Sequence, residues 1–202
     1  MRVLARFLLS ATNVSHFPAP GTPEVAFLGR SNVGKSHLIN SLVGHKVART
    51  SSTPGRTQSI NFFEIRWPGN PRPEMMFADL PGYGYSRVPR EISAQWPTFI
   101  EPYLQTRPCL ALCLALVDAN VPPQESDKQL LTFLHDTGRR FLIVATKTDK
   151  LSGNQARSAL HTLQKELPPA PIIAYSARTG AGRDELWQAI RAAVKDRTSR
   201  EA

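Results

Sequence analysis

Eight consecutive residues near the N-terminus have the types and spacing of a loop that holds phosphate groups. They fit the pattern GxxxxGK(S/T) and read Gly29-Arg30-Ser31-Asn32-Val33-Gly34-Lys35-Ser36. In such a loop the glycines let successive backbone N–H groups point at anionic oxygens, and the following helix N-terminus adds its dipole. Lys35 would reach the β- and γ-phosphates, and the Ser36 hydroxyl would bind Mg²⁺. The alternative, a glycine turn beside an exposed lysine, is disfavoured because an apolar run precedes the loop and a helical pattern follows it.

A second glycine-containing loop reads Asp79-Leu80-Pro81-Gly82 and follows a predicted strand. An aspartate at such a place can hold the Mg²⁺ shell through water, while the glycine N–H reaches the γ-phosphate. The DxxG pattern alone is weak evidence, but its position downstream of the phosphate loop makes it strong. The sequence therefore predicts that Asp79 and Gly82 complete a site for Mg²⁺ and a nucleoside triphosphate.

A third loop points to the base of the nucleotide. It reads Thr146-Lys147-Thr148-Asp149 and directly follows the apolar run 141–145. The Asp149 carboxylate can accept hydrogen bonds from guanine N1–H and N2–H₂, and adenine offers no such pair of donors. The Lys147 stem would lie along the base, and in the later loop Tyr175-Ser176-Ala177 the Ala177 N–H could donate to guanine O6. Alone, the Thr146 loop would be a polar turn leading into a helix; in this order it predicts guanine binding.

The segment 45–59 has neither helical nor strand periodicity and contains Pro54-Gly55. A loop of this length inside a compact domain is usually functional. It is expected to supply a threonine near the Mg²⁺, and three threonines compete for that place: Thr50, Thr53 and Thr57. Spacing alone does not choose among them.

The rest of the chain alternates apolar strands with amphipathic helices, which is typical of a mainly parallel sheet covered on both faces. A turn at 68–73, rich in proline, joins two strands that should pair antiparallel. The fold class is therefore α/β, with a mixed six-stranded sheet and one antiparallel edge strand; Pro97 and Pro102 should break or bend the second helix. The predicted strands are 25–28, 60–67, 75–78, 109–117, 140–145 and 171–175, and the predicted helices are 35–43, 92–104, 124–135, 154–167 and 184–195.

Composition and charge describe a soluble, globular chain with a basic surface. Of 202 residues, 41% are hydrophobic and 20% are charged, which excludes a disordered protein. Lys and Arg number 25 against 16 Asp and Glu, giving a net charge of +9. A nucleotide does not require such an excess, so an extended polyanion such as RNA becomes a candidate partner; the alternative is a merely basic surface.

The cysteines and the N-terminus bear on the cellular compartment. Cys109 and Cys113 lie in one apolar run and are expected to be buried free thiols in a reducing compartment. No apolar stretch approaches the ~20 residues of a membrane span. The apolar N-terminus is interrupted by Arg6 and lacks the continuous core of a signal peptide. The sequence thus predicts a cytoplasmic protein.

The order of these motifs resembles that of the EngB (YihA/YsxC-type) ribosome-biogenesis GTPases, within the TrmE-Era-EngA-EngB-Septin-like class. The motifs are GRSNVGKS, TSSTPGRTQSINFF, DLPGYGYS, TKTD and YSA, and the resemblance covers roughly residues 5–195. Its most specific pieces are TPGRTQSINFF and DLPGYGYS. It implies a three-layer, Ras-like P-loop GTPase domain at 24–197, an N-terminal extension at 1–23 that packs on this domain, and a basic C-terminal tail at 198–202.

The resemblance also implies a function and a ligand set. The protein is expected to bind GTP and GDP with Mg²⁺, to hydrolyse GTP slowly, and to act in assembly of the large ribosomal subunit, so that its loss disturbs growth, division and septation. The implied Mg²⁺ ligands are Ser36, Thr57 and, through water, Asp79; the implied catalytic residues are Lys35 and Thr57. Besides the loops above, the implied nucleotide contacts are Gly55, Arg56, Thr57, Gln58 and Ser59.

Two positions depart from the broader GTPase pattern. Thr146 replaces asparagine and is expected to lose an amide that normally ties loops together, although TKxD is usual in the family it resembles. Tyr83 follows Gly82, where Ras-like enzymes carry the glutamine that orients the attacking water, so unaided turnover should be slow. We hypothesise that Asn32 helps bind K⁺ beside the phosphates, as similar loops do in related GTPases, and that K⁺ offsets transition-state charge. The alternative is a loop-stabilising Asn32 side chain.

Basic residues cluster in the two long loops and near the C-terminus. They are expected to contact ribosomal RNA phosphates when GTP orders the loops, and no membrane, DNA or second copy of the chain is expected as a partner. The alternatives are a metabolic P-loop kinase, against which the guanine loop argues, and a division-machinery scaffold with a regulatory nucleotide. The basic residues are Lys46, Arg49, Arg56, Arg87, Arg90, Arg191, Lys195, Arg197 and Arg200.

Overall fold

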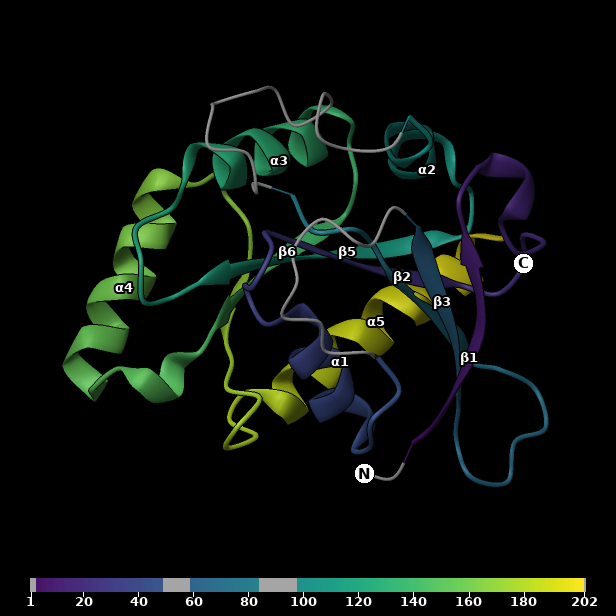
Figure 1. The fold of residues 1–202 in the computed structure, drawn as a ribbon, viewed down its shortest axis with the longest axis horizontal. Helices are drawn as coiled ribbons and strands as arrows, with labels where there is room; N and C mark the ends of the chain where they lie inside the picture. Colours follow the sequence, from purple (N-terminus) through teal and green to yellow (C-terminus); the bar gives the residue numbers. More distant parts are fainter. Residues whose placement is uncertain (1–2, 49–58, 84–97, 202) are drawn as a thin grey trace.

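A central sheet of seven strands carries helices on both faces (Figure 1). The computed structural model describes residues 3–48, 59–83 and 98–201. The strands are β1 (Leu4–Ala11), β2 (Glu24–Gly29), β3 (Ile60–Arg66), β4 (Met75–Asp79), β5 (Leu110–Asp118), β6 (Phe141–Thr146) and β7 (Ile172–Ala174). Their order across the sheet is β1-β3-β4-β2-β5-β6-β7. The pairs β1–β3 and β3–β4 are antiparallel, and the other neighbouring pairs are parallel.

The middle of the sheet is buried on both faces. All residues of β2 and β4 are buried, and β5 is buried from Leu110 to Val117. Continuous apolar runs of this kind are typical of parallel strands that helices cover on both sides. The mainly parallel α/β fold predicted from the sequence is therefore confirmed.

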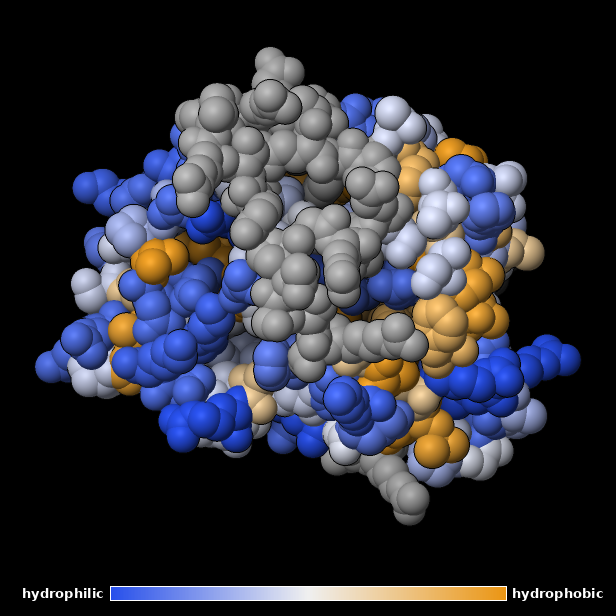
Figure 2. Space-filling model, in the orientation of Figure 1, coloured by the Kyte–Doolittle hydropathy of each residue, from blue (hydrophilic) through white to orange (hydrophobic). Residues whose placement is uncertain are grey.

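The strand count differs from the prediction, because residues from the N-terminal segment form an additional edge strand. β1 pairs along the outer side of β3, with Leu4 opposite Arg66 and Ala11 opposite Ile60, so the antiparallel strand β3 is not the edge. An irregularity in register between Phe7 and Leu9 interrupts the alternation that identifies a strand. Leu4 and Phe7 also remain about half exposed, at 48% and 50%, and apolar side chains gather at this edge of the molecule (Figure 2).

Helices cover the two faces of the sheet in two groups (Figure 1). One face carries α1 and α5, which pack through residues such as Leu38 and Leu186. The other carries α2, α3 and α4, which pack through residues such as Leu104, Leu130 and Leu163. The helices are α1 (Lys35–Val43), α2 (Ile100–Thr106), α3 (Glu125–Asp136), α4 (Gly153–Glu166) and α5 (Arg183–Glu201), with short 3-10 helices η1 (Val14–His16) and η3 (Thr148–Lys150).

Most helix limits agree with the sequence pattern. α1 begins and ends where predicted, and Gly44 caps it with the left-handed φ of 82° that favours glycine. Of the predicted helix 92–104, residues 92–97 lie outside the described part of the chain, and α2 begins at Ile100. Pro102 lies in the first turn of α2, where its missing N–H is not needed. α5 continues to Glu201 and so includes residues 198–201 of the predicted tail.

A buried ion pair fixes the beginning of β2. Glu24 is fully buried, and its carboxylate accepts hydrogen bonds from Arg107 (Nη2 to Oε1, 2.6 Å) and from Tyr103 of α2 (Oη to Oε2, 2.8 Å). Arg107 also donates to the Pro18 carbonyl at 2.8 Å. The segment before β2, helix α2 and the approach to β5 are therefore joined at one point.

Both cysteines are buried and free, as predicted. Burial raises the pKa of the Cys109 thiol to about 11 and that of the Cys113 thiol to about 12, so both stay protonated at neutral pH. None of the helices in the described ranges has an apolar stretch long enough to cross a membrane.

Candidate functional site

The polar loops predicted from the sequence converge at one edge of the sheet. β2, β4, β5 and β6 run parallel, so their carboxyl ends at Gly29, Asp79, Asp118 and Thr146 lie at the same edge. β7 pairs parallel with β6 and ends beside them at Ala174. In open α/β sheets this edge is the place where ligands bind.

The predicted phosphate loop is held in a tight curl between β2 and α1. A Cβ on Gly29 would lie 2.8 Å from Val33 Cγ1, so only glycine fits there. Gly34 has φ 103° and Asn32 has φ 66°, and these left-handed turns bring the chain back to the start of α1 at Lys35. The first N–H groups of a helix lack intrahelical partners and attract anions. The loop therefore has the geometry of an anion-binding cradle.

Two predicted phosphate and metal residues are joined directly. Lys35 Nζ donates to Asp79 Oδ1, and both side chains are largely shielded, at 13% and 9% exposure. Ser36 follows Lys35 in the first turn of α1, so a hydroxyl and a carboxylate are available at one side of the loop. Such hard oxygen donors fit Mg²⁺, which keeps several waters and takes few protein ligands. The residues present therefore suit this cation.

The loop Asp79–Gly82 lies against the phosphate loop. The Ser31 N–H donates to the Tyr83 carbonyl at 2.9 Å, and Arg30 and Tyr83 form a backbone bridge. A Cβ on Gly82 would lie 3.0 Å from Ser31 Oγ and 3.1 Å from Ser31 N, so glycine permits this approach. Leu80 and Pro81 are buried and anchor the loop in the protein.

The Tyr83 side chain turns into the protein. It is 2% exposed, and its hydroxyl donates to Asp127 Oδ1 of α3 at 3.1 Å. Burial, followed by the nearby Asp127 charge, raises the Tyr83 pKa well above its usual range, so the phenol stays neutral. The sequence identified Tyr83 as the replacement for a water-orienting glutamine, but it gave no sign of the partner on α3.

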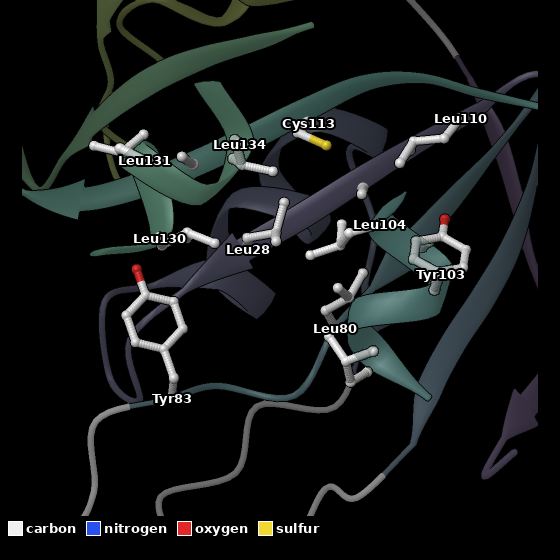
Figure 3. Packing of buried hydrophobic residues seen from close by; sticks show 14 of the residues in the cluster. Leu28, Leu80, Tyr83, Tyr103, Leu104, Leu110, Cys113, Leu130, Leu131 and Leu134 are labelled. Carbon is white, nitrogen blue, oxygen red and sulfur yellow. The ribbon is translucent and has the colours of Figure 1, made fainter. Parts of the chain in front are cut away.

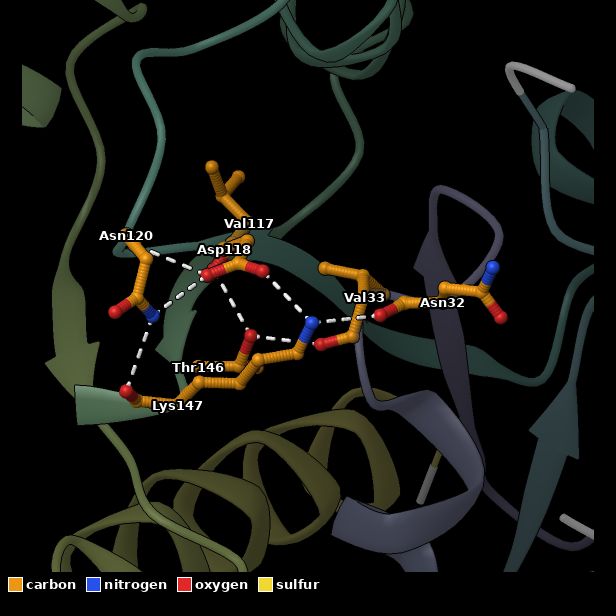
Figure 4. Close-up of polar contacts among 7 residues, drawn as sticks. All are labelled: Asn32, Val33, Val117, Asp118, Asn120, Thr146 and Lys147. Atoms are coloured by element: carbon orange, nitrogen blue, oxygen red, sulfur yellow. Dashed lines mark hydrogen bonds and ion pairs between the residues drawn. The ribbon is translucent and has the colours of Figure 1, made fainter. Parts of the chain in front are cut away.

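Thr146 ties the base loop to the phosphate loop, which corrects a prediction. The sequence led us to expect that replacing asparagine here loses an inter-loop bond. Instead, Thr146 Oγ1 lies 2.8 Å from the Val33 carbonyl and 3.2 Å from the Val117 carbonyl, and Thr146 is buried (Figure 4). The shorter side chain suffices because the Val33 carbonyl of the phosphate loop comes within reach of β6.

A polar cluster that sequence reasoning missed surrounds Lys147. Its Nζ donates to the Asn32 carbonyl at 2.8 Å and to Asp118 Oδ2 at 2.7 Å (Figure 4). Asn120 Nδ2 donates to Asp118 Oδ1 at 2.9 Å and lies 3.2 Å from the Lys147 carbonyl. Burial alone would raise the Asp118 pKa, but the hydrogen bonds from Lys147 and Asn120 lower it. The available signal was two polar residues at the end of the apolar strand β5, Asp118 as its last residue and Asn120 just beyond it.

Asp149, the predicted guanine acceptor, is held by two partners. Ser176 Oγ donates to its Oδ1 at 2.7 Å, and Arg178 Nε donates to its Oδ2 at 2.7 Å. These two hydrogen bonds, that from Arg178 first, lower the Asp149 pKa, which keeps the carboxylate ionised at neutral pH. The Asp149 side chain is 11% exposed and that of Arg178 is 72% exposed. Arg178 therefore reaches from the surface to an Asp149 oxygen that a guanine donor would use.

The loop after β7 also contacts the base loop through its backbone. The Tyr175 carbonyl accepts from the Thr148 N–H at 3.3 Å, while the buried Tyr175 side chain points into the core and donates to Ser41 Oγ of α1 at 2.9 Å. Tyr175 was predicted to contact the nucleotide, but its ring faces α1 instead. Ala177 is half-buried beside Ser176 at the start of the following turn.

Some predicted residues cannot be compared with the structure. Ser59 directly precedes β3, whereas Gly55, Arg56, Thr57 and Gln58 lie outside the described residues. The competing threonines, Thr50 and Thr53, also lie outside, as do Arg49, Arg87 and Arg90. Of the remaining basic residues, Lys46, Arg191 and Lys195 are exposed, and Arg191 stacks over Trp67 with its Cζ 4.6 Å from the ring centroid.

We predict that Thr146→Val lowers the free energy of unfolding by about 1–3 kcal/mol and weakens GDP binding. The substitution keeps the shape but leaves the buried Val33 carbonyl, the nearer of the two acceptors, without its hydroxyl donor. Chemical denaturation and GDP titration measure both effects. Thr148→Val is the matched control in the same loop, because the backbone bond of Thr148 to Tyr175 survives. Equal effects of the two substitutions would contradict the assigned role of the Thr146 hydroxyl.

Comparison with known proteins identifies similar sequences over nearly the whole chain. Residues 24–147 match a family model described as "50S ribosome-binding GTPase". A "Probable GTP-binding protein EngB" from Koribacter versatilis is 60% identical over 190 residues, which cover 94% of each chain. A protein with the same description from Acidobacterium capsulatum is 54% identical over 199 residues, covering 98% of this chain and 94% of that one.

Solved structures share the fold. The crystal structure of a probable GTP-binding protein EngB aligns with a TM-score of 0.65 and 25% identity, covering 86% of this chain and 99% of that one. The structure of Era in complex with MgGDPNP and nucleotides 1506–1542 of 16S ribosomal RNA aligns with a TM-score of 0.65 and 26% identity. That alignment covers 84% of this chain and 55% of the Era chain. The chain is thus similar to GTP-binding proteins in both sequence and fold.

Proposed function

Because the chain belongs to the EngB family of GTP-binding proteins, we propose that it is a GTP-operated factor in assembly of the large ribosomal subunit. The protein binds GTP and GDP and is a GTPase, as its family is. The observation that carries the ribosomal proposal is the match to a family model described as a 50S ribosome-binding GTPase. Effects of its loss on growth, division and septation would follow from impaired ribosome supply, and a ribosomal partner would place the protein in the cytoplasm.

Within this proposal the phosphate loop and Asp149 recognise different parts of the nucleotide. The backbone of residues 29–36 and the Lys35 ammonium bind the phosphates, while the Asp149 carboxylate accepts from guanine N1–H and N2–H₂. The Lys35–Asp79 contact would rearrange so that Lys35 faces the phosphates and Asp79 faces the cation. Ser36, Thr57 and, through water, Asp79 would hold Mg²⁺, which neutralises phosphate charge when bound.

We propose slow unaided turnover because Tyr83, which stands at the position of the water-orienting glutamine, does not take over that role. Tyr83 is neutral and buried against Asp127, so its hydroxyl does not face the phosphate loop. Because Tyr83 does not orient the attacking water, we propose that hydrolysis relies on Lys35 and the backbone donors for stabilisation of the transition-state charge. Binding to a ribosomal particle is proposed to raise the rate.

We further predict that K⁺ speeds GTP hydrolysis at least about tenfold over Na⁺ and that Asn32→Ala removes the difference. Asn32 is exposed, and its side chain points away from the Lys147 cluster while its carbonyl is held by Lys147 (Figure 4). Its amide is therefore available to a cation beside the phosphates. Phosphate release measured in K⁺ and Na⁺ buffers of equal ionic strength tests this. Equal rates in the two salts would exclude a role for K⁺.

Ribosomal RNA is the proposed contact of the basic surface. The net charge is +9, and Lys46, Arg191 and Lys195 are exposed. A protein that neutralises RNA phosphates binds less tightly as salt rises, because counterions are released on binding. Era, a structural neighbour, has been crystallised with 16S ribosomal RNA, which is a property of that protein and here only supports the idea of RNA as a partner.

Co-sedimentation with large-subunit precursors tests the proposed function. The protein is expected to travel with the precursor in the presence of a non-hydrolysable GTP analogue, less so with GDP, and to be released by added salt. Binding without salt dependence would count against an RNA phosphate contact. Absence of co-sedimentation in every nucleotide state would overturn the ribosomal proposal and favour a division scaffold, while GTPase activity would be unaffected.

A further inference from the structure

The hydrogen bond between Tyr83 and Asp127 joins the phosphate-facing loop to α3 inside the protein. Tyr83 is 2% exposed and Asp127 is 3% exposed, and the Tyr83 hydroxyl lies 3.1 Å from Asp127 Oδ1. Figure 3 shows the ring beside Leu130 with the hydroxyl directed toward α3. A buried charged acceptor that receives a phenol donor is a strong, directional contact, because neither partner has water as an alternative.

The backbone of Tyr83 is fixed at the other side. Its carbonyl accepts from the Ser31 N–H at 2.9 Å, and the preceding Gly82 lies so close to Ser31 that a Cβ would approach Ser31 N to 3.1 Å. Tyr83 is thus held by its backbone to the phosphate loop and by its side chain to α3. Gly82, the residue whose N–H is proposed to meet the γ-phosphate, lies directly before this doubly held residue.

Asp127 is itself immobilised, which makes it a suitable anchor. Its Oδ2 accepts from the Gln124 N–H at 3.0 Å, so the same carboxylate caps the first turn of α3. Burial raises the Asp127 pKa, while the bonds from Gln124 and Tyr83 and the nearby charge of Arg30 act to lower it. Arg30 belongs to the phosphate loop, and its Nε is buried without a hydrogen-bond partner among the described residues. Two neutral donors, from Gln124 and Tyr83, and the nearby charge of Arg30 therefore act together on this carboxylate.

We propose that Tyr83 is a positioning residue for GTP hydrolysis, which acts through Asp127 to hold Gly82 at the γ-phosphate. The inference rests on the proposed placement of the γ-phosphate at Gly82. A donor contributes to catalysis in proportion to how well it is preorganised toward the developing charge. The tyrosine that replaces the water-orienting glutamine thus has a different task, because it anchors the loop rather than touching the water.

Tyr83→Phe is the direct test, because it removes the hydroxyl and keeps the ring. In single-turnover assays with saturating GTP, the rate constant for hydrolysis is expected to fall about tenfold. The affinity for GDP, which has no γ-phosphate, is expected to stay within about twofold. A general loss of structure would weaken GDP binding as well, so slower hydrolysis with unchanged GDP affinity identifies a positioning role.

The matched control is Tyr103→Phe. Tyr103 is also fully buried in the same apolar cluster and also donates to a buried carboxylate, that of Glu24, at 2.8 Å. It lies on α2 and belongs to none of the predicted nucleotide loops. Both substitutions should lower the melting temperature, but only Tyr83→Phe should slow hydrolysis.

A second variant examines the anchor. Asp127→Asn keeps an oxygen for the Gln124 N–H and can donate its amide to the Tyr83 oxygen, so it should retain more hydrolysis than Asp127→Ala. Hydrolysis within twofold of the native rate in Tyr83→Phe, or an equal loss in Tyr103→Phe, would overturn the proposal. If the native protein did not bind GTP at all, the proposed site would fail instead, and the two failures are therefore distinguishable.

Discussion

Asp149→Asn is expected to weaken GDP binding by about 10³-fold or more and to create affinity for xanthosine diphosphate. In the native protein the carboxylate at this position is an acceptor-only group, which suits the N1–H and N2–H₂ donors of guanine. Asparagine presents an amide N–H₂ to one of those donors and so repels it. Xanthine carries a carbonyl at C2, and this carbonyl can accept from the new amide.

The measurement is a paired titration with fluorescent guanosine and xanthosine diphosphates. Ser176 Oγ can donate to an asparagine oxygen as it does to Asp149 Oδ1, so the loop should remain folded. Asp136→Asn is the matched control, because Asp136 is an exposed carboxylate at the end of α3 with 66% side-chain exposure. Unchanged GDP affinity in Asp149→Asn would place guanine recognition elsewhere.

The parts of the fold that could be predicted from the sequence are those with local signals. The β2–loop–α1 unit follows from an apolar run, glycines at fixed spacing and a helical pattern that ends at Gly44. β5 follows from a nine-residue strand that is almost entirely apolar. β1 was missed as a strand because its register slips between Phe7 and Leu9, which breaks the alternation on which strand prediction relies.

The site was predictable as a set of loops but not as a network of contacts. Each motif names its own residues, whereas the contacts join residues far apart in the chain, such as Thr146 with Val33 and Tyr83 with Asp127. Asp118 belongs to no motif, so its pairing with Lys147 appears only when β5 and β6 are placed side by side. Sequence spacing determines which groups are present at the edge of the sheet, and packing determines which of them touch.

Arg107→Ala should be among the most destabilising single substitutions outside the nucleotide loops, with a loss of about 3–5 kcal/mol in the free energy of unfolding. The substitution leaves the Glu24 carboxylate buried and without its cation, and the pair has side-chain exposures of only 8% and 0%. It also removes the donor to the Pro18 carbonyl and the cation over the Phe17 ring, 5.6 Å from its centroid. Urea denaturation followed by circular dichroism measures the loss.

Arg140→Ala separates the effect of burial from that of removing an arginine. Arg140 pairs with Asp196 at the same 2.6 Å distance, but the two side chains are 49% and 55% exposed. Water replaces the partner of an exposed charge, so this substitution should cost less than about 1 kcal/mol. If both substitutions cost the same, the stability attributed to the Glu24 contact would have to come from packing of the arginine stem instead. If only Arg107→Ala is strongly destabilising, the buried pair of Arg107 and Glu24 holds the N-terminal segment, α2 and β2 together. These two residues lie 83 positions apart in the chain.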